Sequence, residues 1–115
     1  LFAYTTLFRS TKEFAIYPKD WEMEYLVLGL ASEAGEVAGK LKKLIRGDYT
    51  EDALSTHNLE KYNADLKAEL GDCLWYISEI CSTIGVQLGD VMADNIAKLT
   101  ARKEAATIKG NGDDR

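Results

Sequence analysis

The chain contains few of the residues that interrupt helices or bind transition metals: one proline, one histidine and two cysteines in 115 residues. With Pro18 as the sole proline, long helices are permitted elsewhere. The single histidine, His57, excludes a di-iron carboxylate bundle, which needs two Glu-x-x-His motifs. Cys73 and Cys81 fall in a helical pattern about 12 Å apart along the axis, so we predict free thiols rather than a disulfide. Their spacing also disfavours zinc.

Long apolar runs and a basic surplus are also missing. No run reaches the roughly 18 apolar residues of a membrane span, and no signal-peptide layout is present, so we expect a cytoplasmic protein without a membrane partner. The net charge of -5 argues against a nucleic-acid polymer as partner. The apolar content of 46% is typical of a folded chain, and we predict a single domain over residues 1–115.

Apolar residues recur at steps of three and four along much of the chain, a pattern that predicts helices. Asp20 is a candidate N-cap, and Gly47 and Gly85 are candidate helix ends. The polar stretch 48–58, with His57, is expected to be a loop, and the tail 110–115 to fray. We expect helices over residues 5–15, 21–45, 59–84 and 88–106.

The two longest helices each have an apolar seam. These seams predict an all-α fold, a four-helix antiparallel bundle-like subunit. The apolar surface of two such long helices exceeds what one small subunit can cover, so we expect completion by oligomerisation, as a homodimer or homotetramer. The seams consist of Leu30, Ala34, Val37, Leu41 and Leu44 in the first helix, and of Leu66, Leu70, Leu74, Ile77, Cys81 and Ile84 in the second.

Four acidic residues form two equally spaced pairs, Glu33 with Glu36 and Glu69 with Asp72. The i, i+3 spacing places each pair on one helical face, beside the seam and on the same side of it. If the helices pack antiparallel, the four carboxylates converge at the rim of the interface. Their mutual repulsion is relieved by hard cations such as Mg²⁺. The alternative is that they are solvated acids or partners of lysines, for example Glu36 with Lys40.

Three stretches of the chain resemble the MazG-like family of all-α nucleoside triphosphate pyrophosphohydrolases. They are residues 29–38 (GLASEAGEVA), 69–76 (ELGDCLWY) and 95–99 (NIAKL), and the resemblance spans residues 14–103. Many family members have a further glutamate where this chain has Ser32.

The resemblance implies Mg-dependent hydrolysis of (deoxy)nucleoside triphosphates to monophosphate and pyrophosphate, with nucleotide-pool housekeeping as the purpose. It assigns metal binding and catalysis to Glu33, Glu36, Glu69 and Asp72, with Mn²⁺ as a possible substitute for Mg²⁺. The chemistry suits the residues, because cations offset the triphosphate charge and a carboxylate can take the proton of an attacking water. The number of metals and the identity of the base stay open.

Further residues are candidates for binding the substrate. Asn95, Lys98 and Arg102 fall at i, i+3 and i+7 and suit phosphate oxygens; for Arg102 an ordinary exposed position is the alternative. Tyr76 follows Asp72 by one turn and can meet the nucleotide.

Other aromatic residues have less specific expectations. Phe14, Tyr17 and Trp21 can stack a base, but we expect them mainly to pack the first helix onto the bundle. Trp75 is predicted to point away from the seam, toward a subunit interface.

Two other functions remain in view. One is a non-catalytic helical module that senses nucleotides or binds a partner, and it would use the same seams. The other is hydrolysis of diphosphates as well as triphosphates, as in similar all-α deoxyuridine nucleotide hydrolases. Comparing the release of pyrophosphate and phosphate separates the two enzyme activities, and substitution of Glu36 or Asp72 tests the catalytic hypothesis.

Overall fold

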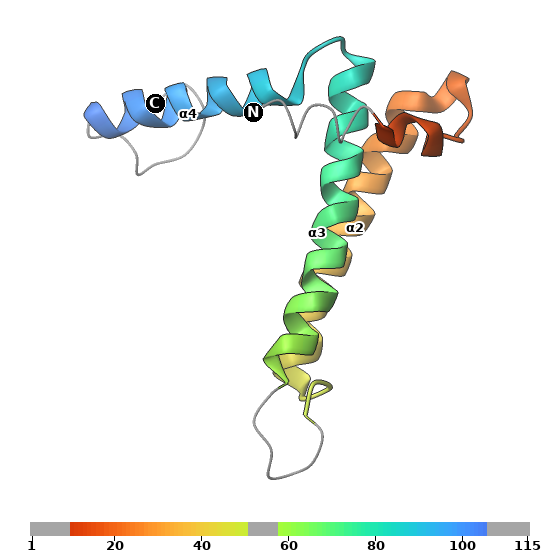
Figure 1. Ribbon diagram of the computed structural model, residues 1–115, viewed down its shortest axis with the longest axis vertical. Coiled ribbons are helices and arrows are strands. Elements are labelled where there is room, and N and C mark those ends of the chain that lie inside the picture. Colours follow the sequence, from red (N-terminus) through yellow and green to blue (C-terminus); the bar gives the residue numbers. More distant parts are fainter. Residues whose placement is uncertain (1–9, 51–57, 106–115) are drawn as a thin grey trace.

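Helices account for all the regular secondary structure of residues 10–50 and 58–105, the part of the chain that the computed structural model describes (Figure 1). The prediction of an all-α fold is therefore confirmed. None of these helices is long and apolar enough to cross a membrane. In chain order the elements are the 3-10 helices η1 (Ser10–Phe14) and η2 (Lys19–Trp21), followed by α2 (Glu22–Arg46), α3 (Leu59–Thr83) and α4 (Leu88–Glu104).

Helices α2 and α3 form an antiparallel hairpin, lying side by side along their lengths (Figure 1). Helix α2 ends at Gly47, whose φ of 91° is a left-handed conformation that favours glycine. At the start of α3 the Asn58 side chain accepts a hydrogen bond of 3.0 Å from the Lys61 backbone N–H. Gly85, with φ of 75°, follows the end of α3. Local sequence signals thus set both ends of the hairpin.

The N-terminal boundary of α2 differs from the expected one. Asp20 is not the N-cap, because residues 19–21 form η2 and Trp21 occupies the cap position without a side-chain cap hydrogen bond. Of the helix expected over residues 5–15, the described part, Ser10–Phe14, is a 3-10 helix. His57 with most of the expected loop, residue 106 and the tail 110–115 lie outside the described residues.

Helix α4 begins near the C-terminal end of α3 and runs away from the hairpin (Figure 1). Its contacts with α3 are few, and apolar side chains such as Met92 and Ile96 stay exposed. The described part of the chain is therefore a helical hairpin with a projecting third α-helix. The four-helix antiparallel bundle is not confirmed.

The line of α2 residues that faces α3 passes through polar side chains. Leu26 is 0% exposed, and Leu30, Glu33, Val37 and Lys40 are each partly buried. The spacing of four, three, four and three residues keeps this line on one face of α2.

Part of the expected apolar seam, by contrast, faces solvent. Leu41, Leu70 and Leu74 are 50%, 46% and 45% exposed. Glu33 therefore lies in the line that faces α3 and not at its rim, and part of the apolar surface of the hairpin is left uncovered.

Candidate functional site

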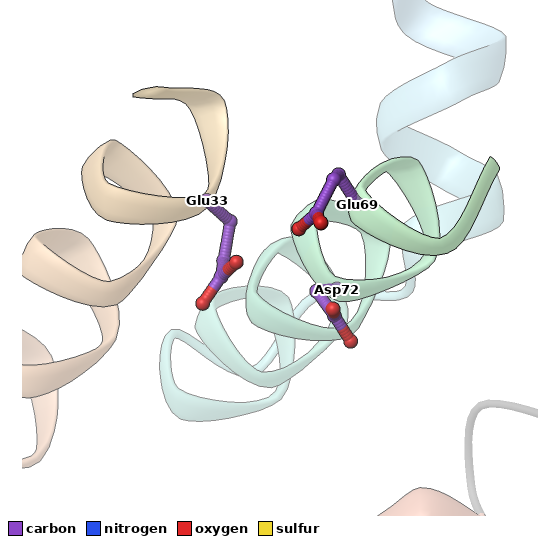
Figure 2. Close-up of side chains that lie close together, drawn as sticks. All are labelled: Glu33, Glu69 and Asp72. Atoms are coloured by element: carbon purple, nitrogen blue, oxygen red, sulfur yellow. The ribbon is translucent and has the colours of Figure 1, made fainter. Parts of the chain in front are cut away.

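Three of the four predicted acids form one cluster between α2 and α3. Glu33 extends from α2, opposite Glu69 and Asp72 on α3 (Figure 2). One carboxylate oxygen from each lies within 4.8 Å of the others. Glu33 and Glu69 are partly buried and Asp72 is exposed. The i, i+3 spacing on α3 places Glu69 and Asp72 one turn apart, so both can face a single glutamate on the antiparallel helix.

Glu36, the fourth predicted acid, is exposed and lies outside this group of three. Its negative charge still acts on Glu33, because it is one of the charges that raise the pKa of Glu33. Glu36 is therefore near the cluster, and its predicted role as a metal ligand stays a prediction.

The three carboxylates suit a hard divalent cation. Desolvation raises the pKa of Glu33, and the charges of Asp72, Glu69 and Glu36 raise it further. A raised pKa means that the ionised form of Glu33 is disfavoured in the folded protein. A divalent cation between the three oxygens would remove that penalty, and an all-oxygen donor set is the one that Mg²⁺ prefers. The residues present therefore fit the metal that the sequence predicts.

One lysine contacts the cluster. The Nζ atom of Lys40, on α2, lies 2.9 Å from Oε1 of Glu69 on α3, and the two side chains are only 15% and 16% exposed. The hydrogen bond to Glu69 raises the pKa of Lys40. The sequence had suggested Glu36 as the partner of Lys40, since both are on α2. The ion pair instead joins the two helices.

A cleft of about 480 Å³ opens beside the carboxylates. Two of the three acids, Glu33 and Asp72, form part of its wall, and the rest of the wall is mostly aromatic. This volume is in the range of small-molecule sites. The cleft is lined by Phe14, Ile16, Tyr17, Tyr25, Glu33, Asp72, Trp75 and Tyr76.

Four of these aromatic rings contact one another in a closed circuit. Tyr17 stacks on Tyr25 with ring centroids 5.1 Å apart, and Tyr25 lies 6.4 Å from Tyr76. Tyr76 meets the edge of Trp75 at 4.9 Å, and Trp75 returns to Tyr17 at 6.5 Å. The circuit joins α2, α3 and the segment before η2, so it gives the cleft a preformed wall.

Tyr17 holds the segment before α2 in place. Burial raises the pKa of Tyr17 to about 12, and the carboxylates of Glu79 and Glu22 add to the shift. The hydroxyl therefore keeps its proton at neutral pH and can donate it in a hydrogen bond to one of these carboxylates, Glu79 on α3 or Glu22 on α2.

Trp75 lies in the cleft wall rather than at a distance from it. The prediction that Trp75 points away from the seam of α3, toward a subunit interface, assumed that the seam faces α2. The sequence does contain a signal for this position of Trp75. Trp75 follows Asp72 by three residues, and residues i and i+3 are neighbours on a helix. Tyr76 does lie on the side of the acids, as expected, because it shares the cleft wall with Asp72.

Gly29 allows Tyr76 to approach the backbone of α2. A Cβ atom at position 29 would meet the Tyr76 ring, with Cδ1 only 2.8 Å away and two other ring atoms closer still. No side chain fits between them. Because Gly29 has no side chain, the Tyr76 ring can lie against α2 and form one wall of the cleft.

The predicted phosphate-binding residues lie on α4, the helix that projects from the hairpin (Figure 1). Asn95 and Lys98 are exposed. Arg102 is buried, so the alternative that it occupies an ordinary exposed position is wrong. None of the three lines the cleft. Their roles stay predictions.

Fold and site together define an all-helical protein with a carboxylate cluster beside an aromatic cleft. Residues 22–107 match the family model of the MazG nucleotide pyrophosphohydrolase domain. The chain is 37% identical over 107 residues to the Gene 37 protein of Mycobacterium phage L5, an alignment that covers 88% of this chain and 89% of that protein. No solved structure matches the chain. The protein belongs to the MazG nucleotide pyrophosphohydrolase family, whose members act on nucleoside triphosphates and generally use a divalent metal.

Proposed function

We propose that this protein hydrolyses (deoxy)nucleoside triphosphates to the monophosphate and pyrophosphate, with Mg²⁺ as the metal. Glu33, Glu69 and Asp72 would hold the cation, and Glu36 would complete the set. The observation that carries the proposal is that Glu33 and Asp72 belong both to the carboxylate cluster and to the wall of the aromatic cleft. A nucleotide has the same two parts, a charged phosphate chain and an aromatic base.

The reaction places definite demands on these residues. Mg²⁺ would offset the phosphate charge and polarise the α-phosphate. Water attacks the α-phosphorus, a new P–O bond forms, and the bond from that phosphorus to the bridging oxygen breaks, so that pyrophosphate leaves. One of the carboxylates accepts the proton of the water. Mn²⁺ can replace Mg²⁺ at such oxygen ligands, so we expect it to support activity.

The aromatic cleft is the proposed site of the base. Tyr76 and Trp75 meet edge to face, and stacking of a base on such rings is favourable for every base because each has a π face. Desolvation raises the pKa of Tyr76, and among the smaller contributions are the charges of Glu33 and Asp72. Tyr76 therefore lies near the two acids, and it shares the cleft wall with them.

We also propose that the protein is a homodimer or homotetramer. Leu41, Leu70 and Leu74 on the hairpin and Met92 and Ile96 on α4 are exposed apolar side chains, and a second copy is a suitable cover for them. Within one subunit α4 projects away from the acids, so phosphate binding by its residues would require a neighbouring copy. Light scattering during size-exclusion chromatography tests the proposal, and a monomer at micromolar concentration would contradict it.

The hydrolysis is tested by measuring pyrophosphate release from a panel of canonical and modified nucleoside triphosphates, with Mg²⁺ and with chelator. We expect release that depends on the metal, is abolished by chelator and is restored by excess Mg²⁺ or Mn²⁺. We propose that the protein clears selected nucleotides from the pool. The base that is preferred in the panel would identify these nucleotides.

The same assay separates the alternatives. Phosphate release from diphosphates would extend the activity to that class. If the folded protein released neither product from any nucleotide in the presence of Mg²⁺, the hydrolase proposal would be wrong and a nucleotide-sensing module would be favoured.

A further inference from the structure

Lys40 differs from a typical surface lysine in where its charge lies. Lysine side chains normally extend so that the ammonium group stays in water, as the exposed Lys42 does. The Lys40 side chain is 15% exposed, and its Nζ atom lies 2.9 Å from the Glu69 carboxylate. It therefore places a positive charge at the edge of the carboxylate cluster, where a purely solvated lysine has no reason to be.

The site has a direction along the hairpin. On α2 the order is Tyr25, Glu33 and Lys40, with steps of about 12 Å and 10 Å along the axis at 1.5 Å per residue. On the antiparallel α3 the matching order is Tyr76, Asp72 and Glu69.

Along both helices the order of features is therefore the same: first the aromatic cleft, then the carboxylates, then the ion pair with Lys40. The lysine lies on the opposite side of the cluster from the cleft.

A nucleoside triphosphate has the same order of parts: base, sugar, α-phosphate, then β- and γ-phosphates. With the base in the aromatic cleft and the α-phosphate at the carboxylates, the β- and γ-phosphates extend toward Lys40. We propose that Lys40 binds these two phosphates, which leave together as pyrophosphate, and that it exchanges Glu69 for them when a cation binds the Glu69 carboxylate. This inference rests on the proposed function and adds the orientation of the substrate to it.

The exchange is reasonable on charge grounds. A cation at Glu69 neutralises the carboxylate that now holds Lys40, which leaves the ammonium group without its partner. Pyrophosphate offers several anionic oxygens, and an ammonium group has three N–H donors for them. In the absence of metal the same lysine offsets part of the repulsion among Glu33, Glu69 and Asp72, so one side chain serves both states.

A purely structural role is the competing explanation, since the ion pair joins α2 to α3. The two explanations differ in which ligands are affected. A structural lysine would change the binding of every ligand of the site to a similar extent. A lysine that binds the β- and γ-phosphates would change pyrophosphate binding and leave metal binding intact.

The experiment is calorimetric titration of the full chain with Mg²⁺ alone and, in saturating Mg²⁺, with inorganic pyrophosphate. The variants are Lys40→Met and Lys40→Gln, with Lys42→Met as the matched control that removes an exposed charge from the same helix. For both Lys40 variants we expect the Kd of pyrophosphate to rise about tenfold to hundredfold, the effect of losing a charged hydrogen bond. The Kd of Mg²⁺ should be unchanged or lower, and Lys42→Met should stay within about twofold of wild type throughout.

Circular dichroism checks that each variant is folded. Lys40→Gln guards against misfolding in Lys40→Met, because its amide N–H can still donate a hydrogen bond to Glu69. Pyrophosphate affinity near the wild-type value in both variants would overturn the inference. So would a loss of Mg²⁺ affinity as large as the loss of pyrophosphate affinity, and so would a wild-type protein that does not bind pyrophosphate.

These outcomes are separate from failure of the proposed function. Hydrolysis by the wild type with unchanged pyrophosphate binding in the variants would refute the role of Lys40 alone. Pyrophosphate binding that depends on Lys40, in a protein that hydrolyses no triphosphate, would refute the hydrolase and keep the phosphate site.

Discussion

Replacement of Asp72 by asparagine is expected to lower kcat/KM for triphosphate hydrolysis by about a hundredfold or more, with the hairpin still folded. The amide keeps the shape of the side chain but removes the negative charge that would bind the cation. Asp72 is exposed, so no buried cavity or unpaired group results. Its charge also helps to raise the pKa of Glu33, and its removal lessens that repulsion. The melting temperature of the metal-free variant should therefore equal or exceed that of the wild type.

Steady-state kinetics and thermal melts with and without Mg²⁺ measure both effects. The stabilisation that Mg²⁺ gives the wild type should shrink in Asp72→Asn, because a ligand that binds the native state stabilises it by an amount that rises with the logarithm of the affinity. Glu60→Gln is the matched control, since Glu60 is an exposed acid in the first turn of the same helix, and its activity should stay within about twofold of wild type. Near-normal activity of Asp72→Asn would mean that the catalytic site lies in another part of the protein.

Replacement of Gly29 by alanine is expected to destabilise the fold and impair nucleotide binding together. The new methyl group would occupy the space of the Tyr76 ring, whose Cδ1 atom is 2.8 Å from the Cβ position. Alanine gains about 1 kcal/mol over glycine in a helix interior, but overpacking costs typically about 1–3 kcal/mol. The displaced ring also contacts Trp75 and Tyr25. We therefore expect a net loss of stability and a KM raised several-fold.

The control for this substitution lies on the same helix. A Cβ atom added at Gly35 would meet nothing within 4 Å, so Gly35→Ala should gain up to about 1 kcal/mol of stability from helix propensity alone. Urea denaturation of both variants gives the comparison. If Gly29→Ala were as stable as Gly35→Ala, with an unchanged KM, the contact of Tyr76 with the α2 backbone would not matter to the cleft.

Local features of the site were already predictable from the sequence. The helices over α2, α3 and α4 follow from apolar periodicity, and Gly47 and Gly85 mark ends because the left-handed backbone there favours glycine. The equal i, i+3 spacing of the acid pairs also predicted that carboxylates from two antiparallel helices would meet. The helices and their ends need only residues near one another in the chain, whereas the meeting of the carboxylates needed the further assumption that the two helices pack antiparallel.

The faces that the helices turn to each other were decided by the tertiary structure. Apolar residues cover more than one face of α3, so hydrophobicity alone could not say that Leu70 and Leu74 stay exposed while Glu69 faces α2. That rotation pairs Lys40 with Glu69 and brings Trp75 into the cleft.

The course of α4 was likewise beyond the sequence, because its apolar stripe is equally compatible with packing on its own hairpin or on another copy. The sequence by itself determined the helices and the chemical groups that they carry. The tertiary structure decided which of these groups meet, because contacts between helices depend on their rotation and direction, and the local pattern leaves both open.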